Sequence, residues 1–285
     1  MKKVLGITNF LLLIMLIASV RMSAAQLIDV DWSQLHQLKL DSPPLDVATT
    51  PDGELIFILM PGKVAVFNKG SHAQLNQIPL EAGYNRVAYA DDAEMLVLTN
   101  SATRELKSLR IRRVFDISVE GSPYMGFEDA PVTIAVFDDY ECGYCARMEA
   151  TFSQLLAQYP QKIKLVIKQY PLRNHPRARE AAIAAIAAHQ QGKFWEVHSQ
   201  IFANQKELSP QKLDEIAESF ELDMTQFKQD LLSQKVLSLI VRDVREGQRI
   251  GVSGTPTIFI NGKHVDNRSY ENLSRLIEQE LSKQE

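Results

Sequence analysis

The stretch Val132-Thr-Ile-Ala-Val-Phe-Asp-Asp-Tyr-Glu-Cys-Gly-Tyr-Cys145 decides the fold of this chain. Its start, Val132–Phe137, is almost entirely apolar and predicts a buried strand. The cysteines that follow open a predicted helix over Cys142–Tyr159, in which apolar residues recur every three or four positions. A strand, a short loop and a helix that begins at a cysteine form a specific arrangement for sulfur chemistry.

The two cysteines are predicted to have different roles. Cys142 lies at the helix N-terminus, where free backbone N–H groups and the helix dipole favour a thiolate. Cys145 lies one turn further on, within the apolar stripe, so it is shielded from outside partners but can reach Cys142. This asymmetry favours thiol–disulfide exchange, with Cys142 as the nucleophile and Cys145 as the resolving thiol. We therefore expect a redox-active disulfide, with no metal and no organic cofactor.

Two other interpretations of the cysteine pair stay open. The cysteines could form a passive structural disulfide, or they could be half of a metal site. A metal would need two further ligands, and the six histidines show no paired spacing. Because these are the only two cysteines in 285 residues, a disulfide-scaffolded mini-protein and a four-cysteine zinc ribbon are excluded.

The chain after the dithiol continues in an α/β pattern. Ile163–Tyr170 predicts a second strand, and a long helical stretch follows over residues 177–249. The dipeptide Asn261-Gly262, a strong hairpin signal, separates short strands at Thr257–Ile260 and His264–Val265. An amphipathic helix then closes the chain. This order of strands and helices along the chain predicts an α/β domain with a large helical insertion.

The region before the dithiol domain is predicted to be mostly β. Its expected strands are Leu55–Leu59, Val64–Phe67, Arg86–Ala90, Met95–Thr99 and Leu106–Ile111. Residues 47–58 align with residues 87–98 at an offset of 40, and a period near 40 is typical of propeller blades. Two units cannot close a propeller, so the region must cover its edges by packing on the second domain or by pairing with a second copy. The alternative is two similar hairpins without a true repeat.

The N-terminus has the order of a secretory signal peptide. Lys2 and Lys3 precede a mostly apolar stretch over residues 10–20, and small residues follow at Ser23-Ala-Ala25. Cleavage after Ala25 is expected, because the apolar stretch is shorter than the ~20 residues that span a bilayer. The alternative is an uncleaved membrane anchor. After cleavage, we expect a soluble protein in an exported, oxidising compartment.

These patterns divide the chain into four parts. A signal peptide occupies residues 1–25, and a β-rich repeat domain for assembly or substrate docking occupies residues 26–117. A linker over 118–130 carries Gly, Pro and acidic residues without periodicity, and the α/β domain extends over 131–285.

The overall composition excludes several other classes. With 45% apolar and 23% charged residues, the chain is neither disordered nor of low complexity. The formal net charge of -4, without any long Lys/Arg run, argues against a nucleic-acid partner.

The sequence resembles the DsbA-like thiol:disulfide oxidoreductases of bacterial envelopes, which have a thioredoxin fold. The matching motifs are Ala130-Pro-Val-Thr-Ile, Phe137-Asp-Asp-Tyr-Glu-Cys-Gly-Tyr-Cys145, Tyr170-Pro-Leu with His175-Pro176, Phe194-Trp195, and Gly251-Val-Ser-Gly-Thr-Pro-Thr-Ile-Phe-Ile-Asn-Gly262. The resemblance covers the chain from about Gly121 to the C-terminus. It implies a thioredoxin fold with a helical insertion, a periplasmic location, client proteins with thiols or disulfides, and an inner-membrane redox partner. A homodimer through the N-terminal domain is a further expectation.

The resemblance also implies a cis bond between Thr255 and Pro256, where the backbone of Thr255 pairs with bound substrate and Pro256 lies against the cysteine pair. Two features depart from the family. The acidic proton relay six positions before the first cysteine is replaced by Val136, so the relay is missing or another group supplies it. The tuning dipeptide Gly143-Tyr144 matches the DsbC-type isomerases instead of the strongly oxidising members.

The direction of electron flow is harder to predict. Acidic residues precede the dithiol at Asp138, Asp139 and Glu141, and nearby carboxylates oppose thiolate formation. We therefore expect a more reducing couple than that of DsbA, which favours isomerase or reductase work. The alternatives are a DsbA-type oxidase and a non-redox chaperone or binding module with a structural disulfide. Lys168, in the second strand, is expected to be solvated; the alternative is that it faces the dithiol as a charge partner.

Overall fold

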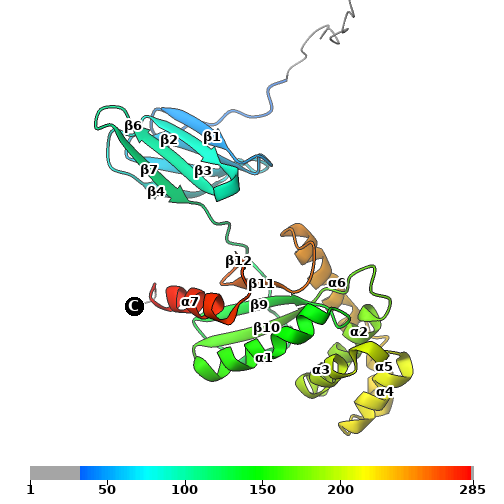
Figure 1. Cartoon of the computed structure of the whole chain (residues 1–285). Helices are drawn as coiled ribbons and strands as arrows, with labels where there is room; N and C mark the ends of the chain where they lie inside the picture. Colours follow the sequence, from blue (N-terminus) through cyan, green and yellow to red (C-terminus); the bar gives the residue numbers. More distant parts are fainter. Residues whose placement is uncertain (1–32, 284–285) are drawn as a thin grey trace, which may run out of the picture. The chain divides into compact units, whose positions relative to one another are not determined.

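The computed structural model describes residues 33–283, so the predicted signal peptide lies outside the described residues. The described residues fold into two compact units: residues 33–91 with Val97–Ser108, and Asp92–Leu96 with residues 109–283. Figure 1 follows both along the chain. Within the described part, no helix combines the length and the apolar composition that crossing a membrane requires.

The N-terminal region is antiparallel β structure. One sheet has the order β1-β2-β3-β4, and a second has the order β5-β6-β7. The strands are β1 (Asp46–Thr49), β2 (Leu55–Met60), β3 (Lys63–Asn68), β4 (Gln74–Pro79), β5 (Arg86–Ala90), β6 (Met95–Asn100) and β7 (Glu105–Arg110), with a 3-10 turn η1 (Asp91–Ala93). The two segments related by the offset of 40 become β1–β2 and β5–β6. A mostly β region is therefore present, and its propeller-like character stays a prediction.

The second unit is built on a mixed five-stranded sheet with the order β12-β11-β9-β10-β8. Its strands are β8 (Tyr124–Gly126), β9 (Val132–Asp138), β10 (Ile163–Gln169), β11 (Thr257–Ile260) and β12 (Lys263–Val265). β9 and β10 are parallel, whereas β8, β11 and β12 run antiparallel to their neighbours. The Asn261-Gly262 hairpin is confirmed, since both residues have the positive φ that a tight two-residue turn needs.

The helices of this unit are α1 (Gly143–Gln158), α2 (Ala178–Gln190), α3 (Phe194–Ala203), α4 (Pro210–Ser219), α5 (Met224–Asp230), α6 (Gln234–Arg249) and α7 (Tyr270–Leu281), with a 3-10 turn η2 (Gln205–Glu207). The segment from α2 to α6 is the predicted helical insertion between β10 and β11. Figure 1 shows α2–α5 grouped beside the sheet. The order of strands and helices is the one expected of a thioredoxin fold with a helical insertion.

The alternation of side chains along β9 builds a core on each face of this sheet. Ile134 and Val136 pack in one cluster with residues of α1 and α7. Ala135 and Phe137 point the other way, into a second cluster that includes Ile250, at the end of α6. The dithiol helix therefore has a rigid strand below it, which fixes where the cysteines lie.

Lys168, which we expected to be solvated or to face the dithiol, does neither. It is fully buried on the α6 side of β10. Its ammonium group lies 2.6 Å from Asp243 and 3.0 Å from Glu246, both on α6, and donates to the carbonyl oxygen of Ser118 at 2.5 Å. The sequence prediction was wrong because burial of a lysine depends on carboxylates that lie more than 70 positions away in the chain.

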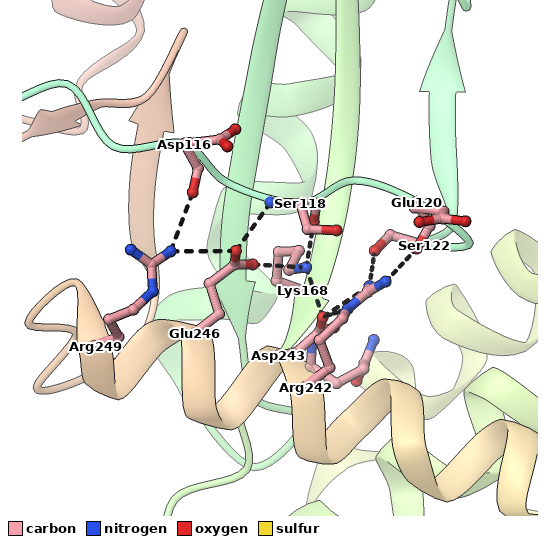
Figure 2. A network of polar contacts seen from close by, with 10 residues as sticks. Asp116, Ser118, Glu120, Ser122, Lys168, Arg242, Asp243, Glu246 and Arg249 are labelled. Carbon is pink, nitrogen blue, oxygen red and sulfur yellow. Dashed lines mark hydrogen bonds and ion pairs between the residues drawn. The ribbon is translucent and has the colours of Figure 1, made fainter.

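The segment that we expected to be a linker takes part in this network (Figure 2). Arg242 donates to the carbonyl oxygen of Glu120 and to the hydroxyl of Ser122, and Arg249 donates to the carbonyl oxygen of Asp116. Residues further along the segment form β8, which pairs with β10. Charged groups on α6 thus hold residues 116–122 against the α/β domain.

Candidate active site

The dithiol lies where β9 ends and α1 begins, as the sequence predicts. Cys142 is the N-cap residue of α1, with extended backbone angles of φ -81 and ψ 109. Its carbonyl oxygen accepts from the backbone N–H of Cys145 at 3.0 Å and of Ala146 at 3.2 Å. The free N–H groups of the first helical turn therefore point toward the Cys142 side chain.

The two thiols differ in their access to solvent. Cys142 keeps 7% of its surface exposed, whereas Cys145 keeps 1% and packs in the cluster under α1. Tyr144, between them, is 67% exposed, and the Arg147 guanidinium lies 4.4 Å from the centre of its ring. An added Cβ at Gly143 would meet its neighbours at ordinary contact distances, so packing does not require glycine there. The predicted tuning role of Gly143 and Tyr144 stays a prediction.

The turn at Thr255-Pro256 lies against the dithiol, although it is more than 100 positions away in the sequence. The peptide bond between these residues is cis, as the family resemblance implies. The Cys142 thiol donates to the carbonyl oxygen of Thr255 at 3.2 Å. A chain that bound along this turn would therefore pass next to the sulfur of Cys142.

Local hydrogen bonds separate the acidities of the two thiols. The pKa of Cys142 is lowered to about 5, chiefly by its hydrogen bond with the Cys145 thiol, while burial opposes the fall. The Thr255 side chain and the backbone N–H groups of Cys145 and Tyr144 lower it further. Burial raises the pKa of Cys145 far above its usual range. At neutral pH, Cys142 is the thiolate and Cys145 holds its proton.

Two of the acidic residues before the dithiol hold its loop in place through backbone hydrogen bonds. Asp139 accepts from the backbone N–H groups of Glu141 and Leu172, both at 2.7 Å, and lies 3.0 Å from the ring of His175. Glu141 accepts from the backbone N–H groups of residues 177 and 178, at the start of α2. These hydrogen bonds fix the loop between β9 and α1 and tie it to the start of α2, and the expected opposition to Cys142 ionisation stays a prediction.

Asp138 is a buried acid on the same strand as Val136, where the family's acidic relay is missing. Alternate residues of a strand share a face, so Asp138, two positions after Val136 in β9, lies on the same side of the sheet. It is 4% exposed, and the Cys145 thiol is among the groups that influence its pKa. The period-two pattern of β9 could have indicated this position, but only once the sheet face that carries α1 was known.

One group of residues has the composition of a metal site. Ligand atoms of Asp138, Glu149 and His198 lie within 4.8 Å of one another. However, both ring nitrogens of His198 already contact protein groups, the Tyr140 hydroxyl at 2.8 Å and Glu149 at 3.2 Å. We therefore interpret the group as a hydrogen-bonded cluster, and we assign no metal to it.

Replacing Asp138 with Asn is expected to stabilise the reduced protein at neutral pH. Burial raises the pKa of Asp138 from 3.8 to about 7, so the folded state loses stability as the pH rises from about 4 to about 7. The Asn side chain does not titrate, so the variant avoids this loss. Above pH 7 its free energy of unfolding should exceed that of the parent protein by about 3 kcal/mol, after about 1 kcal/mol is subtracted for the weakened contact with Cys145. Denaturant unfolding at several pH values, followed by Trp195 fluorescence in a Trp32→Phe background, measures the difference. A gain that does not change with pH would contradict the assignment.

Comparison with known proteins supports the class of site that this geometry defines, a dithiol centre on a thioredoxin fold. Residues 118–279 match the thioredoxin family. BdbD from Bacillus subtilis, in its oxidised crystal structure, is 26% identical with a TM-score of 0.54, over 60% of this chain and 98% of that one. A thioredoxin-like oxidoreductase from Silicibacter pomeroyi DSS-3 is also 26% identical, with a TM-score of 0.51, over 57% of this chain and 94% of that one. The chain belongs to the thioredoxin family.

The curated relatives carry a different name. A Na(+)/H(+) antiporter NhaA 3 of Salinispora tropica is 40% identical over 139 residues, which are 48% of this chain and 21% of that protein. A Na(+)/H(+) antiporter NhaA 1 of Salinispora arenicola is 39% identical over 154 residues, 53% of this chain and 24% of that protein. The chain thus spans less than a quarter of the length of these relatives.

Proposed function

We propose that this chain is an exported protein thiol:disulfide oxidoreductase that exchanges disulfides with client proteins through Cys142 and Cys145. The observation that carries the proposal is the asymmetry of the pair. The pKa of Cys142 lies below neutrality and the residue keeps 7% of its surface exposed, whereas the pKa of Cys145 is far above its usual range and that residue keeps 1%. An attacking thiol and a resolving thiol need these opposite properties.

The turn at Thr255-Pro256 is proposed as the place where the client chain binds. The backbone of Thr255 would pair with an extended client segment, and this would bring the client sulfur to Cys142. The 3.2 Å contact between the Cys142 thiol and the Thr255 carbonyl oxygen supports this location. The client cysteine would then form a mixed disulfide with Cys142, which Cys145 resolves.

We propose an isomerase or reductase role over one-way oxidation, with a DsbA-type oxidase as the alternative. The pKa of about 5 for Cys142 lies between the ~3.5 of DsbA and the ~7 of thioredoxin. The couple should therefore lie between about -270 and about -120 mV. Equilibration in glutathione buffers measures it, and a value at the DsbA end would favour the oxidase.

Replacing Cys145 with Ala is expected to trap mixed disulfides between Cys142 and client proteins. Without the resolving thiol, the client can leave only by attack of an outside thiol, so the adduct should accumulate at least ~10-fold over the parent protein. Non-reducing electrophoresis of the exported fraction, with mass spectrometry of the adducts, checks this. The Cys142→Ala/Cys145→Ala variant is the control, and adducts that persist in it would exclude Cys142 as the attachment point.

The antiporter activity in the names of the curated relatives is not proposed for this chain, since the match covers under a quarter of those proteins. A periplasmic location, an inner-membrane redox partner and a homodimer through residues 26–117 are proposals that follow from the family resemblance. Sedimentation of the full chain distinguishes a monomer from a dimer.

The rival function is a chaperone or binding module whose disulfide only staples the site. Its support is the set of exposed large apolar side chains in the N-terminal region: Leu35, Leu38, Leu45, Val47, Leu75 and Leu106. Antiaggregation activity that survives in the Cys142→Ala/Cys145→Ala variant, without redox turnover in the parent protein, would favour it.

A further inference from the structure

A groove with a volume of about 360 Å³ lies between α2 and α6. Its floor is apolar and consists of Ile183 from α2 and of Leu237, Ile240, Val241 and Val244 from α6. The α6 positions follow the spacing of a single helix face. Val241 is 39% exposed, so the described part of the chain does not fully cover this face. An apolar strip is therefore left open on the surface.

Two arginines lie at the same end of the groove. Arg179 is in the first turn of α2, and Arg245 is close to the end of α6. Burial and, after it, the charge of Lys235 lower the pKa of His189. Because Lys235 is at the start of α6 and His189 at the end of α2, the two helices run antiparallel. The start of α2 and the end of α6 are therefore neighbours, and both arginines line the groove there.

The charges of these two arginines are not neutralised. Both side chains are exposed, and neither has a hydrogen-bond or ion-pair partner among the described residues. The helix α6 carries four basic and two acidic residues, although the formal net charge of the chain is -4. The N-terminus of a helix is its positive end, so the dipole of α2 adds to the charge of Arg179. This end of the groove therefore favours a negatively charged partner.

The cationic end of the groove is tied to the loop that carries the dithiol. Pro171 lines the groove. The residue before it, Tyr170, donates its backbone N–H to the carbonyl oxygen of Asp138 at 2.8 Å. The residue after it, Leu172, donates its backbone N–H to the Asp139 carboxylate at 2.7 Å. A protein that occupied the groove would therefore be held next to the dithiol loop.

We infer that the groove between α2 and α6 docks an acidic, apolar segment of a partner protein, with carboxylates at Arg179 and Arg245 and apolar side chains along the floor. The inference rests on the proposed function for the kind of partner, a client or a redox protein, and deepens it. The groove is distinct from the turn at Thr255-Pro256, which is proposed for the reacting segment. Because the arginines come from two helices, they can bind two carboxylates, so a protein segment with paired acidic residues suits them better than a fatty acid with one.

Peptides that differ in charge or in apolar content test this docking. The probes are rhodamine-labelled, amidated peptides without cysteine: Glu-Glu-Leu-Val-Leu, Lys-Lys-Leu-Val-Leu and Glu-Glu-Ser-Thr-Ser. Each is mixed with increasing amounts of the full-length protein, and binding is followed by fluorescence anisotropy. The first peptide should bind saturably, with a Kd at least ~10-fold lower than that of either other peptide, because only the first combines carboxylates with apolar side chains.

The Arg179→Glu/Arg245→Glu variant should bind the first peptide at least ~10-fold more weakly than the parent protein does. It should bind the basic peptide instead, because the charges of the protein and of the peptide are then both reversed. The control is Arg268→Glu/Arg275→Glu, which makes the same change of charge at two exposed arginines on and just before α7. In the control, the Kd of the first peptide should stay within about 2-fold of the parent value.

Equal weakening in the two double variants would overturn the inference, since general attraction to the charge of the protein would then explain the binding. Equal affinity for the two acidic peptides would also overturn it, because the apolar floor would then contribute nothing. If no peptide bound, and calorimetry showed laurate bound to the parent protein but not to Arg179→Glu/Arg245→Glu, the groove would belong to a lipid instead. Failure of the proposed function is distinguishable: the parent protein would not reduce insulin, whereas peptide binding, which involves no thiol, would be unaffected.

Discussion

The Cys142→Ala variant is expected to lose catalysis of insulin reduction and of scrambled-ribonuclease refolding. Both rates should fall at least ~100-fold below those of the parent protein, to the rate of the uncatalysed reaction. The loss follows from the structure because Cys145 cannot take over the attack. It is 1% exposed, and burial raises its pKa far above the usual range, so it is neither reachable nor ionised.

The matched control is a conservative substitution two residues away from Cys142. Tyr144→Phe keeps the ring beside Cys142 and removes only an exposed hydroxyl, so it should keep most of the activity. If Cys142→Ala retained both activities, the chemistry would have to lie elsewhere in the chain, and the enzymatic proposal would fail.

Replacing Lys168 with Met is expected to destabilise the α/β domain by about 3–5 kcal/mol. Methionine fills a similar volume, but it leaves the carboxylates of Asp243 and Glu246 buried without the ammonium group that lies 2.6 Å and 3.0 Å away. Arg242 and Arg249 still pair with Asp243 and Glu246, but both arginines are partly exposed. The carboxylates therefore lose their only buried cationic partner among the described residues, and the loss should exceed that of most single substitutions.

Urea unfolding of the reduced protein, followed by Trp195 fluorescence in a Trp32→Phe background, measures this loss. Lys228→Met is the control, since its exposed ion pair with Asp214 should contribute less than about 1 kcal/mol. Equal losses for the two variants would mean that the buried network in Figure 2 does not hold residues 116–122 in place.

The strands and helices with strong periodic patterns were predictable from the sequence. β9 is an almost continuous apolar run, β10 is rich in isoleucine, leucine and valine, and α1 follows its apolar stripe from Cys145 to Tyr159. The Asn261-Gly262 turn was predictable because few dipeptides adopt positive φ at both positions. In each case the local sequence and the tertiary packing favour the same structure.

Elements whose structure depends on distant partners were not predictable. β4 is mostly polar and exposed, so its residues carry no alternation, and the three-residue β8 owes its structure to pairing with β10. Lys168 was assigned to solvent because a strand lysine has no local partner, and its carboxylates come from α6.

The candidate site was also predictable only in part. Cys142 and Cys145 stand together in the sequence, and family resemblance brought Thr255-Pro256 to them. The acid cluster beneath was missed, because Tyr140 meets His198 across 58 positions and His198 meets Glu149 across 49. Contacts of that range are visible only after the helical insertion has folded.

The ionisation of Cys142 is the claim on which the proposed reaction most depends. Alkylation of the reduced protein with iodoacetamide between about pH 4 and about pH 9, with the modified residue identified by mass spectrometry, tests it directly. We predict one fast thiol, Cys142, whose rate rises with a midpoint at about pH 5, and a Cys145 that stays unmodified. Two inert thiols, or a midpoint near the ordinary ~8.5 of cysteine, would contradict the account.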